Sequence, residues 1–195
     1  MLQFLVFLGF ICAVYGTVIY FKDTLSGRVK PNKVGWLMWS IAPLIATVAA
    51  LSKGVTWAVL PVFMSGFGPL CIFIASLFSK KAYWEIKLFD YLCGFLSALA
   101  LILWLITKEA NIAIVLAIAS DAFAAIPTLK KAWTNPESES ATLYLTFLIS
   151  ALTSFAAIEY WVFPQYAFAV YLVFINISLL FAISYGKVLN ISKSN

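Results

Sequence analysis

Apolar residues occur along this chain in long runs that are separated by short polar stretches. Each run has about 20 residues, the length with which an α-helix crosses the hydrocarbon core of a bilayer. The first run is full length and has no basic residue before it, so it predicts a retained helix and not a cleaved signal peptide. The pattern predicts seven transmembrane helices, at Leu2–Phe21, Val34–Leu51, Val55–Ser79, Leu88–Thr107, Asn111–Lys130, Ala141–Glu159 and Gln165–Gly186.

The composition strengthens this prediction. Hydrophobic residues make up 64% of the chain and charged residues 11%, whereas soluble domains carry roughly 25% charged residues. A soluble domain of 195 residues could not bury so much apolar surface. The sequence therefore predicts an all-α integral membrane protein whose helices contact the lipid bilayer.

The basic residues predict how the helices are oriented. Lys and Arg concentrate in the cytoplasmic loops of membrane proteins. If the N-terminus lies outside and seven helices follow, all of the 13 Lys and Arg residues except Lys53 and Lys108 fall on the inner side. An even number of helices would move Lys187 and Lys193 to the outer side. The predicted topology is therefore N-out and C-in.

Several classes of function do not fit the residues. The net charge of +5 comes from short loops and not from one contiguous patch, so it does not indicate nucleic-acid binding. The chain has no histidine, and Cys12, Cys71 and Cys93 lack the spacing of metal ligands. Paired mid-membrane carboxylates and nucleophile–base clusters are also missing from the sequence. We expect no enzyme activity, no metal site and no cofactor.

The sequence predicts an internal repeat that relates the first three predicted helices to the last three; the alternative is that apolar segments of low complexity align by chance. Both copies begin on the same side of the membrane, because four helices separate their starts. Parallel repeats of this kind build transporters whose substrate path lies at the repeat interface. The repeat divides the chain into triple-helix bundles at 1–81 and 110–195, with a linker helix in 82–109. The alignment pairs Pro31 with Pro136, Trp39 with Tyr144, Ala49–Leu51 with Ala156–Ile158, and Lys80 with Lys187.

One segment carries a family resemblance. Ala124–Ser140, AAIPTLKKAWTNPESES, has a proline near the inner end of a helix, then a basic loop and a serine-containing start of the next helix. Together with the 3+1+3 helix order, it resembles the PQ-loop segment of the SWEET and PQ-loop (MtN3-like) transporter superfamily. Pro127 is followed by Thr128 and not by the glutamine of the motif. In the first copy of the repeat, Ile19 or a neighbouring residue occupies the position that corresponds to Pro127. The resemblance implies two bundles that rock around a central pocket.

The resemblance also implies pocket residues. It places an asparagine on the third helix of a bundle and aromatic or small residues on the second. Asn176 fits this pattern, and its repeat partner is Pro69, so the first copy lacks the asparagine. Trp39 and Tyr144 are the repeat-related aromatic residues. An intramembrane asparagine either binds a polar solute or joins two helices, and both roles stay open for Asn176.

Asp121 gives the strongest chemical signal. A carboxylate at bilayer depth costs roughly 2.5–3.5 kcal/mol on insertion scales, so such residues normally face a cavity or a partner. Asp121 therefore predicts a coupling site that takes a proton or a cation, or that pairs with a cationic substrate. The alternative is a structural hydrogen bond to a neighbouring helix.

Prolines and aromatic residues complete the candidates. Pro43, Pro69 and Pro127 fall inside predicted helices, where a missing N–H allows a hinge or gate, and Pro61 is predicted to do the same. Gly66 and Gly68 beside Pro69 make the third helix the predicted bend. The aromatic residues considered as pocket walls are Trp36, Trp39, Trp104 and Tyr171, of which Trp36 and Trp104 also suit membrane-interface anchors.

The remaining acidic residues suggest structural roles. Glu137 and Glu139 stand at a helix start, where carboxylates complement the helix dipole, so capping is predicted for both. An inner-side ion pair with Lys130 or Lys131 is the alternative. Asp90 fits a solvated charge at the interface.

The combined prediction is a transporter of a small polar solute, neutral or cationic, such as a sugar, an amino acid or a vitamin-like molecule. A receptor or sorting protein on the same scaffold is the alternative, although no Lys or Arg lies mid-helix to bind a peptide carboxylate. A retinal protein would need a lysine within the last helix, and Lys187 lies at its end. The expected location is a cell membrane, and the bacterial inner membrane is the specific prediction. A homo-oligomer stays open.

Overall fold

The computed structural model describes residues 2–82 and 88–194, with side chains outside the description at 2, 89, 90, 93, 100, 101, 104 and 190–194. The predictions for Asp90, Cys93 and Trp104 therefore concern side chains outside the described residues. All regular structure in the described part is helical, which confirms the all-α prediction. The helices are α1 Leu2–Ser26, α2 Lys33–Leu51, the 3-10 helix η1 Trp57–Val59, α3 Leu60–Phe78, α4 Leu88–Thr107, α5 Ala110–Thr134, η2 Pro136–Ser138, α6 Ala141–Ser154, η3 Phe155–Ala157 and α7 Phe163–Ser194.

Five stretches of the described chain are long and apolar enough to cross a membrane. A further apolar stretch, Ala141–Ala157, is shorter. Large apolar side chains, among them Phe78, Ile106 and Phe174, are exposed on the outside of the bundle, a surface that lipid would cover. These features indicate a membrane-embedded, multi-pass protein. The five stretches are Gln3–Ser26, Lys33–Leu51, Trp57–Phe78, Ala110–Thr134 and Phe163–Leu189.

Several helix ends differ from the predicted ones. The helix predicted to begin at Val55 begins as η1 and continues as α3 from Leu60, so Pro61 lies in the first turn of α3 and not inside the helix. Proline is well tolerated there because the first N–H groups of a helix have no partner within it. The hinge expected at Pro61 was therefore wrong. The first helix runs five residues longer than predicted, and Gly27 (φ 71°) ends it with the N–H of Arg28 on the Asp23 carbonyl.

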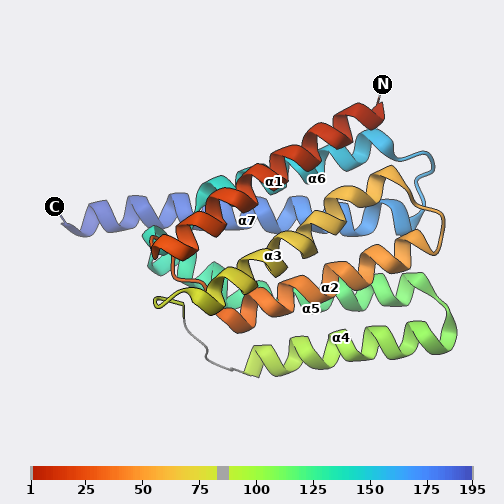
Figure 1. Ribbon diagram of the computed structural model, residues 1–195, viewed down its shortest axis with the longest axis horizontal. Helices are drawn as coiled ribbons and strands as arrows, with labels where there is room; N and C mark the ends of the chain where they lie inside the picture. The colour runs from red at the N-terminus through yellow and green to blue at the C-terminus, as the bar shows by residue number, and fades with distance from the viewer. Residues whose placement is uncertain (1, 83–87, 195) are drawn as a thin grey trace.

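The helices pack in a pattern that repeats. α3 contacts both α1 and α2, and α7 contacts both α5 and α6. Between these two groups, α1 packs on α6 and α2 packs on α5. Exchanging α1, α2 and α3 for α5, α6 and α7 leaves this set of contacts unchanged. α4 lies at the edge of the bundle against α5 and α2 (Figure 1).

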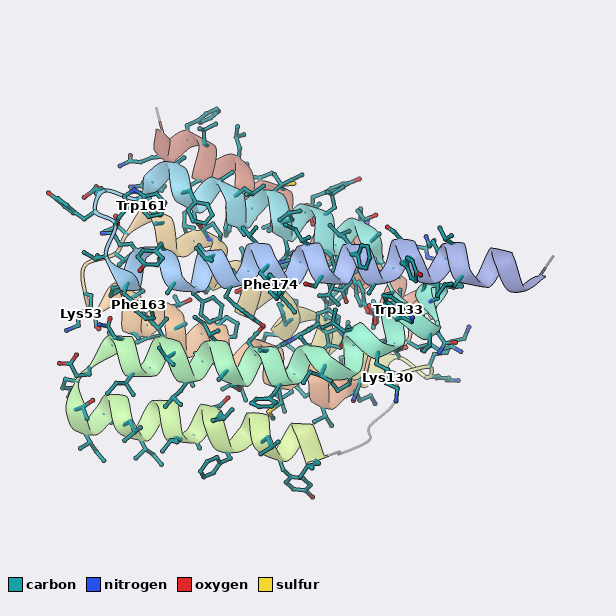
Figure 2. All side chains as sticks on the ribbon, turned by 180° about the vertical axis from the view of Figure 1, so that it is seen from behind. Lys53, Lys130, Trp133, Trp161, Phe163 and Phe174 are labelled. Carbon is teal, nitrogen blue, oxygen red and sulfur yellow. The ribbon has the colours of Figure 1, made fainter. Side chains whose placement is uncertain are left out.

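The chain termini and two labelled lysines distinguish the two ends of the bundle. The chain termini lie at opposite ends of its long axis, and the end of α7 extends past the other helices (Figure 1). Lys53 and Lys130 likewise lie at opposite ends (Figure 2). We call the end that carries Lys130 the basic end and the other the N-terminal end.

Small residues allow α1 and α6 to approach closely. Gly9 and Gly16 lie two turns apart on α1, and a Cβ at either would collide with the side chain of Thr153 or Thr146 on α6. In membranes, where lipid is as apolar as the helices, such small-residue contacts are a main source of helix association. The first and last thirds of the chain are thereby held together along most of α6.

Candidate functional site

A cavity of about 50 Å³ lies in the interior of the bundle, where five helices meet. Its lining side chains are buried, except that of Phe147, which is half-buried. Four of the predicted site residues (Trp39, Asp121, Tyr144 and Asn176) and the predicted hinge Pro69 share this cavity. The lining residues are Trp36, Trp39, Ser65, Pro69, Asp121, Leu143, Tyr144, Phe147, Leu172, Ile175, Asn176 and Leu179.

Both members of two repeat-related pairs line the cavity. Trp39 on α2 pairs with Tyr144 on α6, and Pro69 on α3 pairs with Asn176 on α7. Both halves of the predicted repeat therefore contribute aligned residues to the same cavity.

Asp121 is the one residue of the lining whose side chain can carry a negative charge at neutral pH. It is 5% exposed, and its Oδ2 accepts a hydrogen bond of 2.6 Å from the Tyr171 hydroxyl on α7. Its backbone carbonyl accepts a bond of 3.2 Å from the Trp39 indole on α2. Ion pairs recorded within the described chain lie elsewhere, at Asp23–Arg28 and Lys131–Glu139. Asp121 thus has hydrogen-bond partners but no basic partner in the described residues.

The amide of Asn176 reaches the cavity from α7. Its Nδ2 donates a bond of 2.7 Å to the Leu172 carbonyl of its own helix. This bond holds the side chain against α7, and it does not join two helices. The position in the lining keeps the amide next to any molecule in the cavity.

Trp36 was predicted partly as an interface anchor, and the structure contradicts that role. Trp36 is 4% exposed, with its ring 4.9 Å from that of Tyr20 on α1 and 5.2 Å from that of Trp39. The three rings form a continuous aromatic wall toward the basic end. Hydropathy placed Trp36 near the end of the second helix, but it could not show that α1 covers this position.

The capping role predicted for Glu139 was also wrong. Glu139 has an extended backbone (φ −122°, ψ 154°) between η2 and α6, so it precedes the first turn of α6. Its side chain is buried, and its Oε1 lies 2.6 Å from the Nζ of Lys131. The alternative ion pair is the one observed. Glu137 instead lies in the first turn of η2 and is exposed.

Two tyrosines connect this ion pair to the cavity. Tyr144 and Tyr20 donate hydrogen bonds of 2.8 and 3.2 Å to Glu139 Oε2. Lys131 also donates a bond of 2.9 Å to the Lys30 carbonyl in the loop before α2. Residues Tyr20, Lys131, Glu139 and Tyr144, which we call the basic-end network, therefore tie together both halves of the chain beside the cavity. Tyr20 was missed, because a tyrosine near a basic loop is indistinguishable from an interfacial one.

Apolar packing separates the cavity from the N-terminal end. A void of about 10 Å³ on that side is lined largely by apolar residues, including Ala46, Val59, Ile114 and Phe168. Beyond it lies a larger hollow of about 790 Å³ between the loops, with Thr56, Glu159 and Gln165 among its polar residues. The two ends of the bundle are therefore closed by different means, polar at one and apolar at the other.

Pro43, Pro69 and Pro127 lie inside α2, α3 and α5, as their positions within the apolar runs predicted. Because proline has no N–H, Pro43 and Pro69 leave the carbonyls of Trp39 and Ser65 without the usual donor one turn later. Both of these residues line the cavity. The helices are therefore weakened beside the cavity, as the hinge prediction requires.

The cavity lining combines a carboxylate, an amide and hydroxyl groups with aromatic rings, and these groups can hydrogen-bond a small polar molecule. No group of three or more His, Cys, Asp or Glu side chains within the described ranges is placed to hold a metal ion. The chain matches no protein family, no curated protein and no solved structure. The function is therefore argued from the cavity and from the arrangement of the helices around it.

Proposed function

We propose that this protein is a membrane transporter that carries a small polar solute by alternating access. The observation that carries the proposal is the central cavity, where repeat-related residues of both halves meet beside the buried Asp121. Transporters built from repeats bind their substrates at this kind of interface, near the middle of the bilayer.

In this proposal seven helices cross the membrane, as two triple-helix bundles in 1–81 and 110–195 with a linker helix in 82–109. The repeated helix contacts support this division, because α1–α3 and α5–α7 pack in equivalent ways. The basic end is cytoplasmic, which gives the N-out and C-in topology. The arrangement agrees with the SWEET and PQ-loop resemblance, which we retain as part of the proposal.

Alternating access requires two closures that open in turn. The basic-end network serves as the inner closure, since it joins Tyr20 of the first bundle to Glu139 and Tyr144 of the second. The apolar contacts around Val59 and Phe168 serve as the outer closure. Opening one while the other stays closed exposes the cavity to one side of the membrane.

Asp121 provides the coupling site. An ionised carboxylate without a cationic partner is costly at this depth, so the charge is removed by a proton or balanced by a cation. Tyr171 holds one carboxylate oxygen in place from the neighbouring helix. Transport is therefore expected to depend on a proton gradient or on a cationic solute.

The test is solute uptake by the purified protein in liposomes. A labelled panel of sugars, neutral and cationic amino acids and vitamins is screened with a pH gradient imposed in either direction. We expect at least one solute to enter far faster than into protein-free liposomes, with a rate that follows the gradient and falls to background in Asp121→Asn. Correctly folded protein that moves no solute of the panel would refute the transport function.

A further inference from the structure

The chemistry of the cavity narrows the class of substrate. We propose that the cavity binds a compact organic cation with an ammonium or guanidinium group, in exchange for a proton on Asp121. This inference rests on the transport function proposed above and specifies the solute for the same cavity.

The charge balance of the cavity favours a cation. Asp121 is the one charged residue in the lining, and Lys131 of the neighbouring basic-end network is already paired with Glu139. An anion would place two like charges in a buried site, which is strongly unfavourable. A neutral solute would leave the carboxylate charge unbalanced unless a proton entered with it.

One oxygen of the Asp121 carboxylate can accept hydrogen bonds from a bound cation. Tyr171 donates to Oδ2, and no hydrogen bond reaches Oδ1 from the described residues. An ionised carboxylate has about four lone-pair positions, so a planar or tetrahedral cation can donate to Oδ1 while Tyr171 keeps Oδ2. Tyr171 thereby fixes the direction from which the cation is held.

The walls suit an organic cation more than a hydrated metal ion. Trp36, Trp39, Tyr144 and Phe147 supply four aromatic side chains to the lining. Aromatic rings attract ammonium and guanidinium groups most strongly where water is excluded. Because one water needs roughly 10–15 Å³ of such space, a cavity of about 50 Å³ holds on the order of four water-sized groups. Guanidinium, which has four non-hydrogen atoms, fits this limit.

The exchange follows from the cost of an empty, ionised site. When the cavity opens to water, the cation binds the carboxylate and the proton passes from Asp121 to water. On the other side the cation leaves and a proton takes its place. The bundle returns with either a cation or a proton, but not with a bare carboxylate, because the bare charge is unfavourable at this depth. Each cycle therefore moves one cation one way and one proton the other.

Other titratable groups near the cavity are already engaged or distant. Tyr171 from α7 donates to Asp121 itself, and Tyr144 from α6 donates to Glu139. α2 and α3 contribute Trp36, Trp39, Ser65 and Pro69 to the lining, none of which changes charge near neutral pH. α4 packs on α5 through the hydroxyl bond of 2.7 Å between Ser97 and Ser120. Within the described side chains, Asp121 is thus the group whose proton the cation can displace.

Proton release on binding is the first test. Guanidinium and urea have the same shape and size, and they differ in charge. Added to purified protein in weakly buffered detergent at slightly acidic pH, guanidinium should release up to one proton per protein, and urea none. Asp121→Asn should abolish the release, Asp121→Glu should keep it, and Glu109→Gln, an exposed acid at the start of the same helix, should leave it unchanged. Gel filtration and thermal unfolding establish that each variant is folded.

Transport in liposomes is the second test. Labelled guanidinium should accumulate when the interior is more acidic than the exterior, and its uptake should exceed that of urea roughly a hundredfold, the factor that the cost of an unbalanced carboxylate implies. If guanidinium neither releases protons nor enters while a neutral solute of the panel is carried, the inference is wrong and the transport function stands. If the folded protein moves no solute at all, both are wrong.

Discussion

The two halves of the chain contribute differently to the cavity that they share. α1–α3 supply Trp36, Trp39, Ser65 and Pro69, whereas α5–α7 supply Asp121, Tyr144 and Asn176, with Tyr171 behind Asp121. Where the repeat pairs two positions, the first half has an indole or a proline and the second has a phenol or an amide. The halves are thus alike in helix packing and unlike in chemistry. In the proposed transporter, a duplicated framework supplies two equivalent bodies that move, while substrate recognition depends on residues that only one body carries.

The strongest test of this difference removes the carboxylate from the second half. Asp121→Asn preserves the size of the side chain and its ability to accept the Tyr171 hydrogen bond, but it removes the charge. We expect solute uptake by liposomes to fall to the level of protein-free vesicles. The matched control, Glu109→Gln, should transport like the wild type. Uptake that survives in Asp121→Asn would show that the carboxylate is structural.

A second prediction concerns the network that joins the halves at the basic end. In Lys131→Gln, the Glu139 carboxylate stays buried without its cationic partner, which should lower the free energy of unfolding by about 3–5 kcal/mol. The double variant Lys131→Gln with Glu139→Gln should recover most of this loss, since a glutamine still accepts from Tyr20 and Tyr144. Denaturation in mild detergent measures the free energy of unfolding of the single and the double variant. Lys130→Gln, an exposed neighbour, is the control, and equal losses in Lys130→Gln and Lys131→Gln would argue against the buried pair.

The hydroxyl that supports Asp121 should matter less than the carboxylate itself. Tyr171→Phe removes one hydrogen bond to an ionisable group, worth roughly 1.5–3 kcal/mol, so substrate affinity should fall about tenfold or more. Tyr166→Phe removes a hydroxyl from the same helix that makes no hydrogen bond to Asp121 within the described residues, so it should have little effect. Equal substrate affinities in the two variants would show that the Tyr171 hydroxyl does not contribute to substrate binding.

The smallest expected effect concerns the contact between the halves. Gly16→Ala forces α1 away from Thr146 on α6 and should destabilise the protein by roughly 1–3 kcal/mol. Gly94→Ala on α4 meets no neighbour within 4 Å and should be neutral or slightly stabilising. Thermal unfolding of the two variants gives the comparison. A stable Gly16→Ala protein would show that α1 and α6 do not pack as closely as described.

Hydropathy predicted the helices well because each long apolar run must bury its backbone polar groups within itself. The ends were predicted less well, since capping and turn geometry decide them locally. Gly27 ends α1 beyond its apolar run, and η1 delays the start of α3, which moves Pro61 to the first turn.

Part of the candidate site could be predicted from the sequence, but from rare polar residues and the repeat and not from hydropathy. Asp121 and Asn176 stand out because polar residues are rare inside apolar helices, and the repeat drew attention to Trp39 and Tyr144. The positions of Trp36, Tyr20 and Glu139 depend on which helix covers them. That information comes from the packing of helices distant in sequence, which one amino-acid sequence does not reveal.

The most direct test of alternating access needs no substrate. In a protein with Cys12, Cys71 and Cys93 replaced by alanine, Ser65→Cys places a thiol in the cavity, and Ser76→Cys places one on the same helix at a buried position outside its lining. Membrane vesicles in which the protein has a single known orientation are treated with a membrane-impermeant thiol reagent from one face at a time. We predict that Ser65→Cys reacts from both faces and Ser76→Cys from neither. A Ser65→Cys protein that reacts from one face only, or from none, would contradict a cavity that opens in turn to both sides.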